Sequence, residues 1–129
     1  MSTIRRFEDL EAWKLARDIV REVYLITRTG EFARDFGLRD QICRSAVSVM
    51  SNIAEGFERD GRKEFVNFLS IAKGSAREVR SQLYVALDQN YISHEQFSAL
   101  SERCIQNGRI IAGLIKYLNQ TSVNGLKFK

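Results

Sequence analysis

The segment from Gln41 to Asp60 (QICRSAVSVMSNIAEGFERD) constrains the fold more than any other part of the chain, because it carries two stripes at helical spacing. Both stripes repeat at steps of three and four residues, so each occupies one face of a helix. Serine and asparagine are poor residues for a helix interior unless their side chains have partners. The segment therefore predicts a helix that makes a close and specific contact with a second helix. The apolar stripe consists of Ile42, Ala46, Val49 and Ile53, and the polar stripe of Gln41, Ser45, Ser48, Asn52 and Glu55.

The size of the chain predicts one domain, because 129 residues and 14.8 kDa are enough to bury a real hydrophobic core. With 44% hydrophobic and 28% charged residues, the chain fits neither a disordered nor a membrane protein. The first residues lack the apolar stretch of a secretory signal. Cys43 and Cys104 have no Cys or His nearby, so we expect two reduced core residues in a cytoplasmic protein.

Hydrophobic periodicity predicts four helices, and the absence of proline favours long, uninterrupted ones. The first helix is expected over residues 10–29. The second is expected over residues 38–56, with Gly56 as a left-handed C-cap. The third follows an N-cap at Asp60 and ends at Asn90.

The fourth helix is expected to begin with a capping box formed by Ser93 and Gln96. Because the connections between three of the helices are short, neighbouring helices should run antiparallel. The sequence therefore predicts an all-α, antiparallel up-down-up-down four-helix bundle over residues 1–119. A flexible or docked C-terminal tail is expected over residues 120–129.

The antiparallel arrangement places the polar stripe opposite small and polar residues of the third helix. The expected neighbours are Gln41 with Glu78, Ser45 with Gly74 and Ser75, and Asn52 with Asn67. Small side chains would let the two backbones approach closely, and longer ones would hydrogen-bond across the contact. We interpret the set as a structural inter-helix polar network rather than a ligand site, because it contains no nucleophile, base and orienting group. The network comprises Gln41, Ser45, Ser48, Asn52, Glu55, Asn67, Gly74, Ser75 and Glu78.

Metal, cofactor and catalytic sites are not predicted. Glu55 and Glu78 form a carboxylate pair in a bundle, but di-iron chemistry needs a Glu-x-x-His pattern on two helices. The only histidine, His94, has no such context. A short KGS run at 73–75 lies mid-helix without the preceding strand of a phosphate-binding loop. We therefore expect no catalytic residue, cofactor or metal.

Basic residues give the clearest functional signal. The formal net charge is +4, and two helix faces carry cations at helical spacing. One interpretation is nucleic-acid binding. The other is an ordinary solvated surface, since Glu11, Asp18 and Glu22 lie beside the first stripe. The candidate residues are Lys14, Arg17, Arg21 and Arg28 on the first helix, and Lys73, Arg77 and Arg80 on the third.

Three blocks of the chain resemble the four-helix-bundle proteins encoded in intervening sequences of bacterial 23S ribosomal RNA genes. They are FEDLEAWKLA at 7–16, GLRDQICRSAVSVMSNIAEG at 37–56 and FLSIAKGSAREVRSQL at 68–83. The SNIAEG motif followed by A-x-G-S-x-x-E at 72–78 is specific, and the similarity extends from residue 7 to about residue 119. Relatives usually have proline at the position of Met50 and in the first inter-helix connection. This chain has neither, so its second helix should be straighter.

The resemblance implies a homopentamer of bundle protomers and supplies no reaction. A more distant relative, the accessory protein of diversity-generating retroelements, binds nucleic acid and a reverse transcriptase. The sequence thus favours a non-enzymatic, homo-oligomeric bundle that binds RNA or DNA, with a nucleic-acid-processing protein as a further partner and no membrane. The alternative is a structural or protein-partner scaffold whose cations are incidental, and an enzyme is the third choice.

Overall fold

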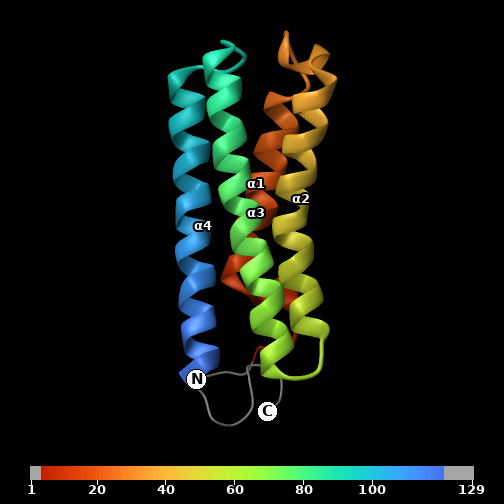
Figure 1. The fold of residues 1–129 in the computed structure, drawn as a ribbon, viewed down its shortest axis with the longest axis vertical. Helices are drawn as coiled ribbons and strands as arrows, with labels where there is room; N and C mark the ends of the chain where they lie inside the picture. The colour runs from red at the N-terminus through yellow and green to blue at the C-terminus, as the bar shows by residue number, and fades with distance from the viewer. Residues whose placement is uncertain (1–3, 121–129) are drawn as a thin grey trace.

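A computed structural model describes residues 4–120 and confirms the all-α four-helix bundle (Figure 1). Successive helices run in opposite directions and each packs against its two neighbours. A short 3-10 turn precedes each of the first two helices. The helices are α1 (Glu11–Ile26), α2 (Phe36–Glu58), α3 (Arg62–Asp88) and α4 (His94–Gln120). Helix α4 thus includes Gln120, and the rest of the expected tail, residues 121–129, lies outside the described residues.

Helix α1 ends at Ile26, three residues before the predicted end at Thr29. The side chain of Thr27 explains the early end, because its Oγ1 bonds the carbonyl oxygens of Val23 at 2.9 Å and Tyr24 at 3.2 Å. Those bonds satisfy helix-terminal acceptors without another helical turn. The chain then reverses through Gly30, whose φ of 62° favours glycine.

Helix α2 is longer than predicted at both ends. At its start, the carboxylate of Asp35 accepts a hydrogen bond from the backbone N–H of Leu38 at 3.1 Å, an N-cap that the sequence analysis missed. At its end, the predicted C-cap at Gly56 is wrong, because the helix continues to Glu58. Gly56 is helical and buried, since a Cβ there would lie 2.7 Å from the Cβ of Phe68. The glycine is needed for close packing, not for a turn.

The ends of α3 and α4 test three predicted caps. The N-cap predicted at Asp60 is wrong, because Gly61, with a φ of 92°, takes that position without a side-chain cap. Helix α3 ends at Asp88 and is followed by Asn90 in a left-handed conformation, with a φ of 62°. The capping box at the start of α4 is confirmed: Ser93 Oγ accepts from the N–H of Gln96 at 3.0 Å, and Gln96 Oε1 accepts from that of Ser93 at 2.8 Å.

Two clusters of buried apolar residues fill the bundle, one toward each end. In the first, the rings of Phe57 and Phe65 meet edge to face with centroids 5.8 Å apart. In the second, fully buried Phe32 stacks on Tyr91 at 5.2 Å, and the Tyr91 hydroxyl donates to Asp35 at 2.9 Å. These contacts of Tyr91 fix the turn before α2 against the turn before α4. Together with the Phe57–Phe65 contact in the first cluster, they hold the helices in register at both ends of the bundle.

Candidate nucleic-acid interface

Two of the four cations in the basic stripe predicted for the first helix are paired with acids. Lys14 lies 3.8 Å from a carboxylate oxygen of Glu11, and Arg21 lies 3.4 Å from Asp18. Arg17 stands over the ring of Trp13, with its guanidinium carbon 5.9 Å from the ring centroid. Arg28 lies in the turn after α1 rather than on the helix as predicted. It is exposed beside Tyr24 and Leu25, in a shallow hollow of about 410 Å³ that is mostly apolar.

The basic stripe of α3 has a different environment, because it lines a groove between α3 and α4. Lys73, Arg77 and Arg80 share a hollow of about 280 Å³ with Arg109 of α4. Among the described residues that line this hollow, none is acidic. None of the four cations forms an ion pair within residues 4–120. The groove therefore concentrates positive charge, with no acid among its described lining residues.

Of the three α3 cations that the sequence predicted, Lys73 and Arg80 are half-buried. Arg77 is exposed, whereas Arg80 is half-buried and its Nε is enclosed without a hydrogen-bond partner. The thiol of Cys104 lies beneath the same groove; burial raises its pKa to about 12, and the nearby charge of Arg80 opposes that rise. Small residues, including Gly108, line the α4 side and leave the hollow open.

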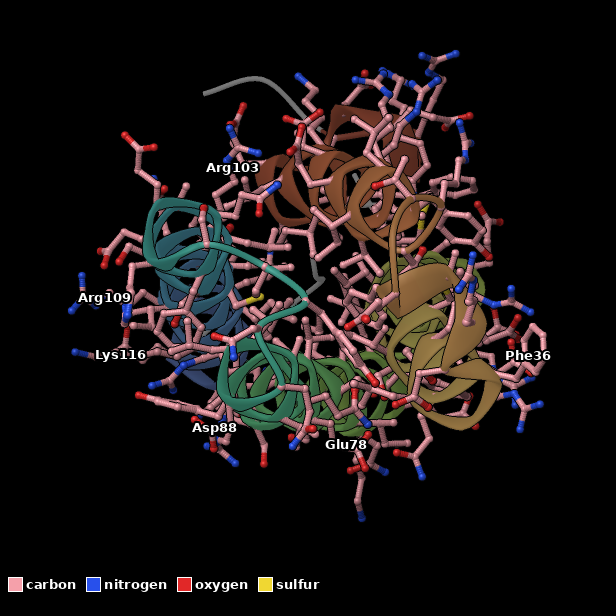
Figure 2. All side chains as sticks on the ribbon, turned by 90° about the horizontal axis from the view of Figure 1, so that it is seen from above. Phe36, Glu78, Asp88, Arg103, Arg109 and Lys116 are labelled. Atoms are coloured by element: carbon pink, nitrogen blue, oxygen red, sulfur yellow. The ribbon has the colours of Figure 1, made fainter. Side chains whose placement is uncertain are left out.

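Arg109 and Lys116 of α4 are basic residues that the sequence analysis did not select. Figure 2, viewed along the bundle, shows both projecting outward from the same side of α4. They are two helical turns apart, so both face one direction, and both are exposed. That spacing of seven was a readable signal, but its meaning depends on how α4 packs against α3.

The polar network between α2 and α3 is present in a different pairing from the one expected. Ser48 Oγ and Ser75 Oγ lie 2.9 Å apart and join the two helices. Asn52 does not reach Asn67, which is exposed; its amide donates to the carbonyl oxygen of Ser48 at 2.8 Å and to Ser48 Oγ at 3.0 Å. Ser45 is buried, 8% exposed.

The outer members of the expected network are exposed to solvent. Gln41, Glu55 and Glu78 are all exposed, and Glu55 lies 3.7 Å from Arg59. The proposed role of Gly74 in close backbone approach is wrong, because a Cβ added there would meet no atom within 4 Å. The close approach occurs instead at Gly56, near the other end of α2.

The described residues contain no cluster of three or more His, Cys, Asp or Glu side chains arranged to hold a metal ion. Within the same range, no helix is long and apolar enough to cross a membrane.

The chain belongs to the family described as 23S rRNA-intervening sequence protein, which it matches over residues 8–113. A crystal structure of a protein of unknown function from the S23 ribosomal protein family of Bacteroides thetaiotaomicron is similar to this chain. That similarity has a TM-score of 0.74 and 26% sequence identity, and it covers 81% of this chain and 95% of the other. No curated protein matches the chain. The family resemblance predicted from the three sequence blocks is thus confirmed.

Proposed function

We propose that this chain is a non-enzymatic, homo-oligomeric cytoplasmic protein that binds RNA or DNA through the basic groove between α3 and α4. The observation that carries the proposal is the convergence of Lys73, Arg77, Arg80 and Arg109 on one hollow that no described acidic residue lines. The printed names of the family and of the similar structure, which refer to ribosomal RNA and to a ribosomal protein family, support RNA as the nucleic acid.

Phosphate groups fit the groove because its donors are guanidinium and ammonium groups. Arginine pairs with phosphate through two parallel N–H donors, and lysine adds a point charge. No aromatic and basic pattern of a known base-reading module appears in the sequence, so affinity should come from the phosphate backbone. Binding should therefore be nearly indifferent to sequence and should depend steeply on salt.

The homo-oligomer rests on apolar side chains that one protomer leaves exposed. On α1 and α2, Tyr24 is 39% exposed, Leu25 is 54% exposed and Val47 is 36% exposed. A contact through this surface would leave the groove between α3 and α4 free and would repeat it around the assembly. The family resemblance implies five copies, and repeated grooves would sum their fields.

A scaffold without nucleic-acid binding is the second candidate. The hollow beside Tyr24, Leu25 and Arg28 favours it, because exposed apolar surface next to a cation suits a protein partner. Under the first candidate function, a nucleic-acid-processing protein is the partner class expected on this surface.

The proposal is tested by measuring the affinity of the purified oligomer for a generic RNA or DNA oligonucleotide at several salt concentrations. Phosphate binding predicts that log K falls linearly with log salt, with a slope of about −0.7 per phosphate contact for a single strand. The absorbance ratio of the purified protein should also reveal co-purified nucleic acid, and light scattering should give a mass above that of one protomer. Absence of binding at low salt would leave the scaffold as the function.

A further inference from the structure

The basic groove ends beside an aromatic pair, in which Tyr84 is exposed and Phe97 is half-buried. Tyr84 follows Lys73, Arg77 and Arg80 at steps of four, three and four, so all four positions share one face of α3. Tyr84 is 52% exposed, and the centroid of its ring lies 4.7 Å from that of Phe97 on α4, with an interplanar angle of 62°. Phe97 thus packs edge to face with the tyrosine, and about half of Tyr84 stays open to solvent.

The groove is recessed, and this shape favours a single strand over a duplex as the ligand. Proteins that read a duplex insert a protruding helix or strand pair into a DNA groove. Here the cations line a crease between two packed helices, and Arg80 lies half-buried within it. A duplex lying across the crease could reach the exposed Arg77 and Arg109, whereas only a narrow strand can follow the crease down to Arg80.

We propose that the groove is a site for single-stranded nucleic acid, in which phosphates follow Lys73, Arg77, Arg80 and Arg109 and one base stacks on Tyr84. The inference rests on the proposed function and narrows its ligand class. Every base has a π-face, so an aromatic platform adds affinity without demanding a sequence.

The length and charge of the groove match a short strand. Eleven residues separate Lys73 from Tyr84, which corresponds to about 16 Å along the helix axis. Asp88, exposed one turn beyond Tyr84, ends the cationic run and repels a further phosphate (Figure 2). The strand's backbone therefore stops before the top of α3, at the level where the stacked base sits. Phosphate and base are common to RNA and DNA, and the choice between them depends on contacts with the sugar.

The test compares three labelled probes on the intact oligomer by fluorescence anisotropy at about 50 mM salt. They are an oligouridylate, an oligothymidylate and a mixed-sequence DNA duplex, each about 15 units long. We expect at least one single strand to bind at least about tenfold more tightly than the duplex. Equal or tighter binding of the duplex overturns this inference and leaves the proposed function standing, whereas failure of all three probes overturns both. Tighter binding of the uridylate or of the thymidylate identifies RNA or DNA as the preferred strand.

Substitutions of Tyr84 and Arg80 locate the strand. Tyr84→Leu should weaken single-strand binding about five- to tenfold, and Tyr84→Phe, which keeps the ring, should restore it. Arg80→Gln should weaken the single strand about tenfold and the duplex less than about twofold. Arg28→Gln is the matched control, because it removes an arginine that likewise makes no ion pair within residues 4–120, from the turn that follows α1. Circular dichroism melting keeps the comparison to folded variants. If both Tyr84 variants and Arg80→Gln bind as the parent does, the strand does not occupy this groove.

Discussion

The side of α3 that faces α2 and the side that faces α4 place their polar residues in different surroundings. On the side of α2, Ser75 Oγ lies 2.9 Å from Ser48 Oγ, and apolar Phe68 packs closely against Gly56. On the side of α4, Lys73, Arg77 and Arg80 make no ion pair within residues 4–120 and line an open hollow. Polar groups that satisfy one another hold helices together, whereas unpaired cations in a groove are available to an external anion.

The largest expected effect is on oligonucleotide binding, and it comes from reversing two positive charges on the side of α3 that faces α4. Arg77→Glu with Arg80→Glu should weaken oligonucleotide binding about 100-fold, which is about 2.7 kcal/mol, because two attractive contacts become repulsive. The matched control is Arg17→Glu with Arg21→Glu, which makes the same change in net charge on α1. That control should cost less than about fivefold. The measurement is anisotropy titration with melting curves for both variants. Equal losses of oligonucleotide affinity for the two double variants would contradict the distinction between the basic stripes of α1 and α3.

The next largest effect should be a loss of folding stability, caused by a substitution at the contact between α2 and α3. Gly56→Ala should lower the free energy of unfolding by about 1–3 kcal/mol, because the added Cβ collides with the backbone-anchored Cβ of Phe68. Gly74→Ala is the matched control on α3. It adds the same methyl group in open space and should be neutral or stabilising by up to about 1 kcal/mol. Chemical denaturation of both variants measures the difference. If Gly74→Ala were the more damaging change, the helix packing described here would be wrong.

Cys104 offers a pH-dependent test of the groove floor. Its pKa of about 12 in the folded chain lies above the ordinary thiol value, so above pH 9 the unfolded state loses its proton first. Stability should therefore fall as pH rises between about 9 and 12, by about 1.4 kcal/mol between pH 8 and pH 10. Denaturation of the parent and of Cys104→Ala at both pH values isolates the contribution. An identical pH dependence would show that the thiol is not buried beneath the groove.

The smallest predicted effect is the coupling between Ser48 and Ser75. A double-mutant cycle with Ser48→Ala and Ser75→Ala should give a coupling energy of about 0.5–1.5 kcal/mol in unfolding. The same variants should bind oligonucleotide like the parent, because their hydroxyls lie on the α2 side. A change in binding without a change in stability would assign this side of α3 to the ligand.

The four helices and their bundle could be predicted from the sequence, because apolar periodicity is a local property of each segment. The capping box of Ser93 and Gln96 was predicted correctly for the same reason: both partners lie within one turn. Gly56 shows where local reasoning stops. A glycine near a helix end suggests a cap, and only the approach of Phe68 from α3 reveals that it is a packing residue.

The candidate site was predictable only in part. The α3 stripe of Lys73, Arg77 and Arg80 was visible as helical spacing, and so was that of α1. The acids beside the α1 stripe were visible too, since Glu11 and Asp18 each lie three residues before the cation that they pair with. The groove beside the α3 stripe was not, because it forms only when α4 packs against α3. Arg109 joins the groove only through the packing of α4 against α3, a register that one sequence does not specify.

The most direct test of the central claim is photo-crosslinking of the intact oligomer to a 4-thiouridine-containing RNA strand, with the linked peptides identified by mass spectrometry. Binding in the groove predicts crosslinks near the C-terminal end of α3 and the N-terminal end of α4, around Tyr84 and Phe97. These crosslinks should disappear at high salt. Crosslinks confined to α1 and α2 would contradict the assignment of the groove as the nucleic-acid site.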